Sequence, residues 1–303
     1  MDNKLVLIDG HSILNRAFYG VPDLTNAEGL HTNAVYGFLN IMFKILEEEN
    51  ADHLAVAFDL SAPTFRHKMY DAYKGTRKPM PEELREQVPL MKEALQTMNI
   101  PILTMEGYEA DDILGTVAKR CQAEGIEVSV VSGDRDLLQL ADTHIKIRIP
   151  KTSKGSTQIY DYYPEDVKEQ YQVTPTEFID VKALMGDTSD NIPGVPGIGE
   201  KTAAKIIKEY HSIENAHDHI EEIKPARAKN DMAQMSKELA TICITCPIPF
   251  SYEEALIGNL YTPEAFKFMK RMEFKSILNR FDSASMEDKE NGPQKSFKEV
   301  TDK

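Results

Sequence analysis

The feature that most constrains the fold of this chain is an alternation of short apolar segments with helical patterns over its first 150 residues. The apolar segments have the length of buried strands and lie at 4–9, 53–59, 100–105, 127–132 and 145–149. Apolar residues at helical spacing occupy the stretches 33–49, 82–99, 109–121 and 135–141. Strands that alternate with helices predict an α/β fold with a mainly parallel sheet and helices on both faces.

The second half of the chain is predicted to be helical. After about Pro164 the strand-like segments stop, and helical patterns follow at 164–172, 175–186, 200–210, 231–245 and 263–272. We therefore predict an α/β core over 1–165, with an irregular charged loop at about 62–90, and a helical region over 166–281. The polar stretch 282–303 is typical of a disordered tail or linker.

Composition argues against a membrane-spanning or disulfide-stabilised protein. No run approaches the roughly 18 apolar residues that a membrane helix needs. The N-terminus lacks the apolar stretch of a signal peptide, so we expect a cytoplasmic protein. Three cysteines are too few for a disulfide framework. Cys243 and Cys246 lack a second ligand pair, so we expect two buried thiols on a helix rather than a zinc site.

The net charge of −14 argues against a nucleic-acid partner, because phosphate binding uses basic surface. The distribution of the charges weakens that argument, since basic residues concentrate at 65–81, 146–154 and 201–208. Such strips can bind a polyanion, although a solvated face is the commoner meaning of a charge run.

Acidic residues follow four of the predicted strands at the point where each strand ends. These seven residues are Asp9, Asp59, Glu109, Asp111, Asp112, Asp134 and Asp136. In a parallel sheet the carboxyl ends of the strands meet at one edge, where so many carboxylates would repel one another. Carboxylate oxygens suit Mg²⁺ or Mn²⁺, and their number implies two ions. Two such ions are the arrangement that promotes in-line attack on a phosphodiester.

The stretch Glu109-Ala110-Asp111-Asp112 also has a second interpretation. It stands directly ahead of a helical pattern, where acidic residues cap free N–H groups and suit the helix dipole. Capping explains acids at one helix but not at four strand ends, so we favour a metal site. The same acids could also cap the helix. Glu109 and Asp112 share a helix face, and we expect these two to point toward the shared metal centre.

A glycine-rich turn in the helical region indicates a DNA-binding element. The turn, 194–199, joins one helical pattern to a second that bears Lys201 and Thr202. Backbone N–H groups at such a turn and helix start can bind a phosphate. Helix, Gly-Ile-Gly turn and lysine-bearing helix together indicate a helix–hairpin–helix element, which binds the DNA backbone without reading sequence.

These motifs resemble the 5′-nuclease family, which includes flap endonucleases, phage 5′-nucleases and the N-terminal domain of bacterial DNA polymerase I. The resemblance covers about residues 4–281 and implies a PIN-like α/β core. It rests on Asp9-Gly10, Phe58-Asp59, Tyr73-Lys74-Gly75-Thr76-Arg77, Glu109-Ala110-Asp111-Asp112, Ser132-Gly133-Asp134-Arg135-Asp136 and Gly186-Asp187 through Ala203. No acidic position of the family pattern is missing.

The resemblance also implies two sets of metal ligands. The first metal would be held, directly or through water, by Asp9, Asp59, Glu109, Asp111 and Asp112. The second would be served by Asp134, Asp136, Asp187 and Asp190. On this interpretation, Asp111→Ala or Asp112→Ala abolishes cleavage and largely spares DNA binding.

Further roles implied by the resemblance concern the nucleic acid. Lys74 and Arg77 would lie at the base of a mobile arch and stabilise charge on the scissile phosphate. Tyr73 would stack on a base, while Arg66 and Lys68 would steer the 5′ strand; a solvated basic segment is the alternative for all five. The hairpin would bind DNA, and K⁺ through its carbonyls, with contacts from Gly197, Gly199, Lys201 and Thr202.

The implied activity is that of a structure-specific 5′-nuclease, both 5′-3′ exonuclease and flap endonuclease. It would hydrolyse 5′ flaps, nicked DNA or RNA-primer ends on duplex during replication and repair. The implied protein is a bacterial, nucleoid-associated monomer that can be covalently linked to a polymerase region.

Three other interpretations fit the sequence less well. A PIN-type ribonuclease shares the acidic α/β core, but such domains are typically shorter and lack the hairpin. A DNA-binding module without catalysis would not need the complete acids together with Lys74 and Arg77. A haloacid-type phosphatase is disfavoured because His11, rather than a second aspartate, stands two residues after Asp9.

Overall fold

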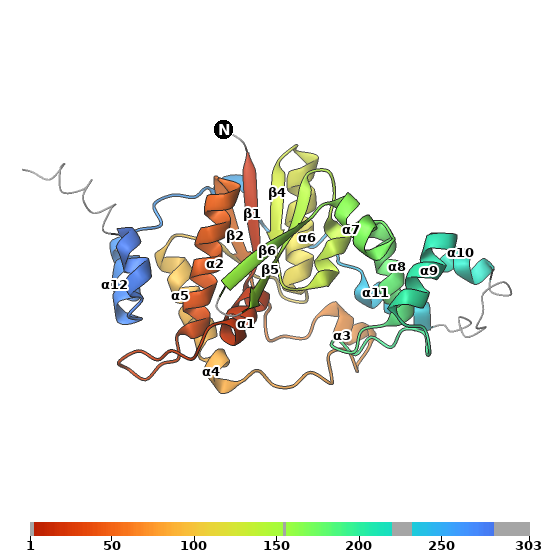
Figure 1. Ribbon diagram of the computed structural model, residues 1–303, viewed down its shortest axis with the longest axis horizontal. Coiled ribbons are helices and arrows are strands. Elements are labelled where there is room, and N and C mark those ends of the chain that lie inside the picture. The colour runs from red at the N-terminus through yellow and green to blue at the C-terminus, as the bar shows by residue number, and fades with distance from the viewer. Residues whose placement is uncertain (1–2, 154–155, 220–231, 282–303) are drawn as a thin grey trace, which may run out of the picture.

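The computed structural model describes residues 3–153, 156–219 and 232–281, and it contains a six-stranded sheet with the order β3-β2-β1-β4-β5-β6 (Figure 1). The strands are β1 (Lys4–Asp9), β2 (His53–Ala57), β3 (Ile102–Leu103), β4 (Glu127–Val131), β5 (Ile145–Ser153) and β6 (Ser156–Tyr162). The first five are parallel, and β6 pairs antiparallel with β5. The prediction of a mainly parallel α/β sheet is confirmed; the predicted tail at 282–303 lies outside the described residues.

The sheet is buried on both faces, as parallel sheets usually are. Along β1, Leu5 and Leu7 pack into one apolar cluster, while Val6 and Ile8 pack into another on the opposite face. The first cluster is covered by α6 (Ala110–Ala123), the 3-10 helix η1 (Arg135–Leu140) and α8 (Pro175–Met185). The second is covered by α1 (Gly10–Gly20), α2 (Asn33–Glu49), α5 (Gln87–Thr97) and α12 (Pro263–Arg271).

Several elements differ from the sequence-based expectation. Helix α1 was not expected; it begins where β1 ends because the Asp9 carboxylate accepts a hydrogen bond from the Ser12 N–H. Strand β6 was also missed. The helical pattern at 82–99, in which Pro89 allows a kink or a split, forms two helices, α4 (Glu82–Arg85) and α5. Pro89 itself lies in the first turn of α5, where a missing N–H is tolerated.

The helical region divides in space. Helices α7 (Pro164–Tyr171), α8, α9 (Glu200–Tyr210), α10 (Ile213–Asp218) and α11 (Met232–Ala240) gather at one end of the molecule, whereas α12 lies at the other end beside α5 (Figure 1). Helix α11 ends before Cys243 and Cys246, so the expectation that a helix carries these thiols is wrong; Cys246 is buried and Cys243 is half-buried. None of the described helices is long and apolar enough to span a bilayer.

The loop expected at 62–90 runs along one edge of the molecule between α3 (Phe65–Met69) and α4 (Figure 1). Its first part is fixed to the helical region, because the Lys74 N–H donates to the Asp190 carbonyl at 2.8 Å and the Asn191 side chain donates to the Ala72 carbonyl at 2.7 Å. The loop therefore connects the two parts of the protein across the carboxyl edge of the sheet.

Candidate metal centre

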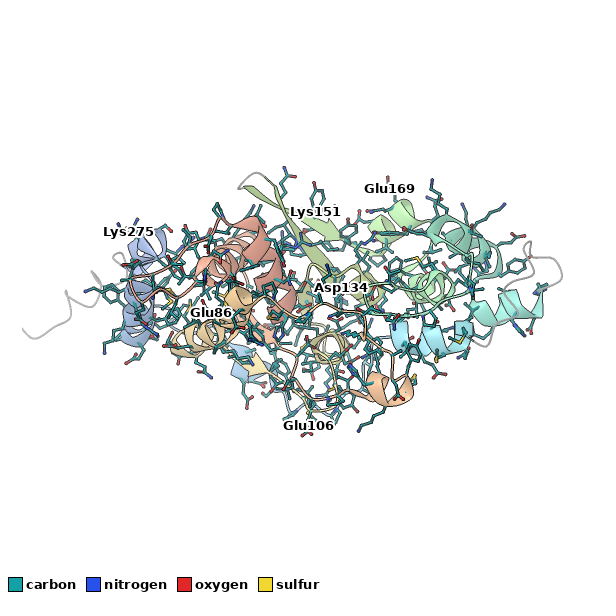
Figure 2. The ribbon with its side chains drawn as sticks, turned by 90° about the horizontal axis from the view of Figure 1, so that it is seen from below. Glu86, Glu106, Asp134, Lys151, Glu169 and Lys275 are labelled. Atoms are coloured by element: carbon teal, nitrogen blue, oxygen red, sulfur yellow. The ribbon has the colours of Figure 1, made fainter. Side chains whose placement is uncertain are left out.

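An open cavity of about 1290 Å³ lies at the carboxyl edge of the sheet, where the strands were expected to deliver their acids. Figure 2 places Asp134 near the middle of the molecule. The acidic side chains that line the cavity are Asp9, Asp59, Glu109, Asp111, Asp134, Asp136 and Asp187. Asp112 and Asp190 do not line it, although both were predicted metal ligands.

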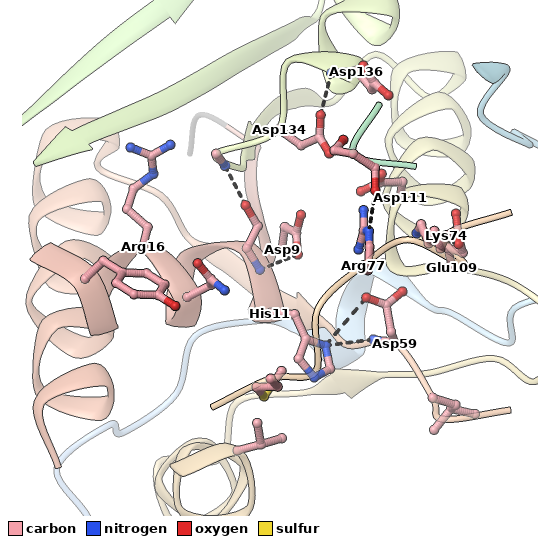
Figure 3. Close-up of a pocket in the computed structure, with 18 of the residues that line it drawn as sticks. Asp9, His11, Arg16, Asp59, Lys74, Arg77, Glu109, Asp111, Asp134 and Asp136 are labelled. Atoms are coloured by element: carbon pink, nitrogen blue, oxygen red, sulfur yellow. Dashed lines mark hydrogen bonds and ion pairs between the residues drawn. The ribbon is translucent and has the colours of Figure 1, made fainter. Parts of the chain in front are cut away.

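The first group of acids gathers around Asp9 (Figure 3). Asp9 accepts hydrogen bonds from the Ser12 N–H at 3.0 Å and the Ser132 hydroxyl at 2.8 Å. Burial, followed by the charge of Asp59, raises the pKa of Asp9 to about 7. Burial and the charges of Asp9 and Asp134 likewise raise the pKa of Asp111. These carboxylates thus repel one another when all are ionised.

The second group is partly neutralised by a buried lysine. Lys182 Nζ lies 2.9 Å from Asp136 Oδ1 and also donates to Asp187. Burial tends to raise the pKa of Asp187, but hydrogen bonds from Lys182 and Ser189 lower it to about 2. The pKa of Asp136 is nevertheless raised to about 7 by burial and by Asp134. One ammonium group therefore does not balance this group of carboxylates.

The donor set fits a hard divalent cation, since it consists of carboxylate oxygens whose mutual repulsion a cation would relieve. In the part of the chain that the structure describes, no three His, Cys, Asp or Glu side chains are close enough to hold one ion as they stand. The cavity is therefore chemically suited to metal, and its carboxylates would have to draw closer to coordinate one.

Asp112 does not contribute to this cavity, which corrects the expectation that Glu109 and Asp112 point to the shared centre. Asp112 is fully buried, and both its oxygens pair with the Arg66 guanidinium at 2.8 Å. It also accepts the N–H of Glu109 at 3.0 Å, so it caps α6. Asp111, one residue earlier, lines the cavity instead.

The expected role of Arg66 is corrected by the same contacts. Only 2% of Arg66 is exposed, and its nitrogens donate to Glu109, to Asp112 and to the carbonyls of Leu239 and Thr241. A guanidinium held in this way cannot reach a DNA strand. Lys68, by contrast, is exposed, as its predicted contact with the 5′ strand requires.

The arch cations are paired with the predicted metal ligands. Lys74 Nζ lies 2.6 Å from Glu109 Oε1 (Figure 3). Arg77 pairs with Asp190. Both cations line the cavity. Tyr73 is only 3% exposed, so the expectation that its ring stacks on a base is wrong for this conformation.

The predicted hairpin lies away from the cavity, between α8 and α9. Gly186 and Gly194 have positive φ angles, and a side chain on either would collide with the backbone of the other segment. This close approach folds the turn back on α8. The exposed residues of the hairpin include all of the predicted DNA contacts, Gly197, Gly199, Lys201 and Thr202.

Some cavity residues were not predicted from the sequence. His11 Nδ1 accepts the Asp59 N–H at 3.3 Å, and Lys92 lies 5.1 Å from the centre of the Phe58 ring. Arg16 also lines the cavity, and its Nε is buried without a hydrogen-bond partner in the described part of the chain. Lys182 also lines the cavity and was not predicted. Its sequence signal is a lysine placed among the apolar residues Val181, Ala183 and Leu184.

Comparisons with known proteins agree with this architecture. Two family models match the chain: "5′-3′ exonuclease, N-terminal resolvase-like domain" over 4–172, and "5′-3′ exonuclease, C-terminal SAM fold" over 173–262. DNA polymerase I of Bacillus caldotenax is 47% identical over 95% of this chain, and that of Bacillus subtilis (strain 168) is 45% identical over 99%. The chain spans about a third of these relatives, 33% and 35% respectively.

Solved structures share the fold at lower identity. T5 5′-exonuclease with bound zinc has a TM-score of 0.65 and 22% identity, with 89% of this chain and 98% of that chain covered. The catalytic core of Rad2 in complex with DNA has a TM-score of 0.57 and 15% identity, with 89% and 88% covered. At such identities these likenesses establish the fold alone.

Proposed function

The chain belongs to the 5′-3′ exonuclease family, and from this premise we propose that it is a structure-specific 5′-nuclease. It hydrolyses phosphodiester bonds at 5′ flaps, nicks and RNA-primer ends on duplex DNA, with Mg²⁺ or Mn²⁺ as cofactor. Divalent ions in the crystals of T5 5′-exonuclease and the DNA held by Rad2 support the same assignment by analogy.

The observation that carries the proposal is the meeting of carboxylates from four strand ends at one cavity. Asp9, Asp59, Asp111, Asp134 and Asp136 all line it. Burial and repulsion raise the pKa of Asp9 and of Asp136 to about 7. A purely structural cluster would be expected to carry matching cations, whereas the repulsion within this one would be relieved by a divalent ion.

We assign the residues as follows. The first ion would be held by Asp9, Asp59, Glu109 and Asp111, and the second by Asp134, Asp136 and Asp187. Asp190, which does not line the cavity, would join the second group once Arg77 releases it. Divalent ions held there would supply an activated water and stabilisation of charge on the phosphate. Lys74 and Arg77 stabilise the same charge once they leave Glu109 and Asp190. Asp112 and Arg66 support the start of α6 from behind.

The hairpin binds the duplex backbone in this proposal. Gly197, Gly199, Lys201 and Thr202 are exposed at the start of α9, where N–H groups and a lysine suit phosphate. K⁺ bound by carbonyls of the turn would increase the affinity of the hairpin for the duplex backbone. Affinity for duplex DNA that is higher in KCl than in NaCl, at equal ionic strength, would support the potassium site.

The biological setting is proposed from the relatives. DNA polymerase I of two Bacillus species supports a role in bacterial replication and repair, in the nucleoid-containing cytoplasm. Because those relatives are about three times as long, a link to a polymerase region is consistent with the similarity. We propose that the nuclease acts as a monomer.

A cleavage assay tests the proposal. The chain is incubated with a 5′-labelled flap duplex, with Mg²⁺ or with EDTA, and the Asp111→Ala variant serves as the matched inactive control. We expect cleavage in Mg²⁺ alone, products with a 3′-hydroxyl and a 5′-phosphate, and DNA binding by the variant without cleavage. Preferential cleavage of single-stranded RNA would favour a PIN-type ribonuclease, and tight flap binding without any cleavage would favour a DNA-binding module.

A second assay tests the role of the arch. Lys74→Ala is expected to lower the turnover number much more than flap affinity, because its ammonium stabilises charge that develops in the transition state. Lys68→Ala, in the same loop but outside the cavity, is the control and is expected to affect affinity more than turnover. An effect of Lys74→Ala on affinity alone would reduce Lys74 to a phosphate contact.

A further inference from the structure

The hydroxyl of Tyr73 lies between two carboxylates that belong to different parts of the protein. It is 3.1 Å from Glu109 Oε2 and 3.3 Å from Asp190 Oδ2. Glu109 stands at the start of α6 in the α/β core, while Asp190 lies between α8 and α9 in the helical region. A phenol at ordinary pH carries one O–H hydrogen, which the two carboxylates share in a three-centre contact, so the hydroxyl holds both acceptors near one point.

The ring of Tyr73 is fixed by packing. Its side chain forms a small apolar cluster with Ile192, Leu239 and Ala240, and the His67 ring meets it edge-on with centroids 5.2 Å apart. Only 3% of the residue is exposed. A rigid ring with a buried hydroxyl makes a spacer of constant length, which the flexible side chains of Lys74 and Arg77 cannot provide.

The same carboxylates have other donors. Lys74 and Arg66 contact Glu109, and Arg77 contacts Asp190. Each of these cations reaches one of the two acids, whereas the Tyr73 hydroxyl reaches both. Loss of the hydroxyl would therefore leave each acid paired with its own cation. It would remove the side-chain hydrogen bonds that link Glu109 to Asp190 through a single group.

We propose that Tyr73 is a positioning residue that sets the separation of Glu109 and Asp190, and through it the distance between the two metal-binding groups. The inference rests on the proposed function, which assigns Glu109 to the first group and Asp190 to the second. It replaces the base-stacking role that the sequence suggests, because a ring buried among Ile192, Leu239 and His67 has no free face for a base.

Tyr73→Phe tests this proposal because it keeps the ring and removes the hydroxyl. Mn²⁺ binding by the full chain is measured by isothermal titration calorimetry without DNA, and flap binding is measured separately in EDTA. We expect Mn²⁺ affinity to fall roughly tenfold or more, as is typical when a residue that orients metal ligands is lost. Flap affinity in EDTA should stay within about twofold, since no hydrogen bond to DNA is removed.

Two further variants separate the alternatives. Tyr70→Phe removes a hydroxyl from the same segment that contacts neither acid in the described structure, so it should leave Mn²⁺ affinity unchanged. Tyr73→Leu removes the ring as well. If Tyr73 stacked on a base, Tyr73→Phe would bind Mn²⁺ and DNA normally, and Tyr73→Leu alone would lose flap affinity; that pattern would overturn the proposal.

The measurement also distinguishes this inference from the proposed function. The wild-type titration tests whether divalent ions bind at all, and its failure would refute both. Normal Mn²⁺ binding by wild type and by a folded Tyr73→Phe variant would refute the positioning role and leave the nuclease assignment intact. Circular dichroism and a urea midpoint for each variant establish that the proteins compared are folded.

Discussion

Substitution of Asp112 by alanine should lower the free energy of unfolding of the protein. The same substitution at the adjacent Asp111 should not lower it. Sequence alone gives both residues the same metal-binding role. In the structure, Asp112 is completely buried and pairs through both oxygens with Arg66 at 2.8 Å. It also accepts the N–H groups of Glu109 at 3.0 Å and Cys243 at 2.8 Å.

The magnitude follows from what Asp112→Ala leaves behind. The Arg66 guanidinium stays buried with Glu109 as its remaining acidic partner, and two backbone N–H groups lose their acceptor. Removal of one partner from a buried ion pair costs about 3 to 5 kcal/mol, so we expect the free energy of unfolding to fall by about 4 kcal/mol. Asp111→Ala instead removes one of several repelling carboxylates, and should leave that free energy unchanged or raise it.

Urea denaturation in EDTA at pH 7.5, followed by circular dichroism, measures the difference. With a slope of about 3 kcal/mol per molar urea, the Asp112→Ala midpoint should fall by about 1.3 M. The double variant Arg66→Met with Asp112→Leu should recover part of the loss, because no buried charge is left unpaired. Equal midpoints for wild type and Asp112→Ala, or an equal loss in Asp111→Ala, would refute the assignment of Asp112 to the structural ion pair.

Three other predictions concern pH, a buried lysine and the hairpin. Because the pKa values of Asp9 and Asp136 are raised to about 7, the folded protein holds protons that the unfolded chain has released above about pH 4. Stability in EDTA should therefore fall as the pH rises from 5 to 7.5, and a series of urea midpoints should show a shallower fall for Asp9→Asn. Lys182→Met should lower the free energy of unfolding in EDTA by about 3 kcal/mol, because the ion pairs with Asp136 and Asp187 are lost. The loss should be smaller in Mg²⁺, where a metal cation can replace the ammonium group. An equal loss in EDTA and in Mg²⁺ would contradict a metal site there. Lys201→Ala should reduce the slope of log Kd for duplex DNA against log salt concentration by about 1, whereas Lys267→Ala on α12, at the other end of the molecule, should leave the slope unchanged.

Local patterns in the sequence specify the class of fold and the edge of the sheet at which the site lies. Apolar segments of strand length and helical periodicity are local properties, and they were enough to predict a parallel sheet. The carboxyl ends of parallel strands must share an edge, so the cluster of Asp9, Asp59, Asp111 and Asp134 could be predicted without coordinates. The turn before Lys201 could also be predicted from the sequence, because its glycines mark it. Gly186 and Gly194 have backbone conformations and close contacts that exclude other residues.

Long-range packing determines which acid faces the cavity and which one supports the start of α6 from behind. Asp111 and Asp112 are neighbours in the chain, and helical spacing favoured the wrong one as a contributor to the shared centre. The deciding partner of Asp112 is Arg66, 46 residues away, and no local pattern specifies a contact over that separation. The burial of Tyr73 and the crossing of α12 to the far end of the core depend in the same way on distant segments. The reason is physical: periodicity and turn preferences act over a few residues, whereas the pairing of a buried charge is settled when separate elements pack together.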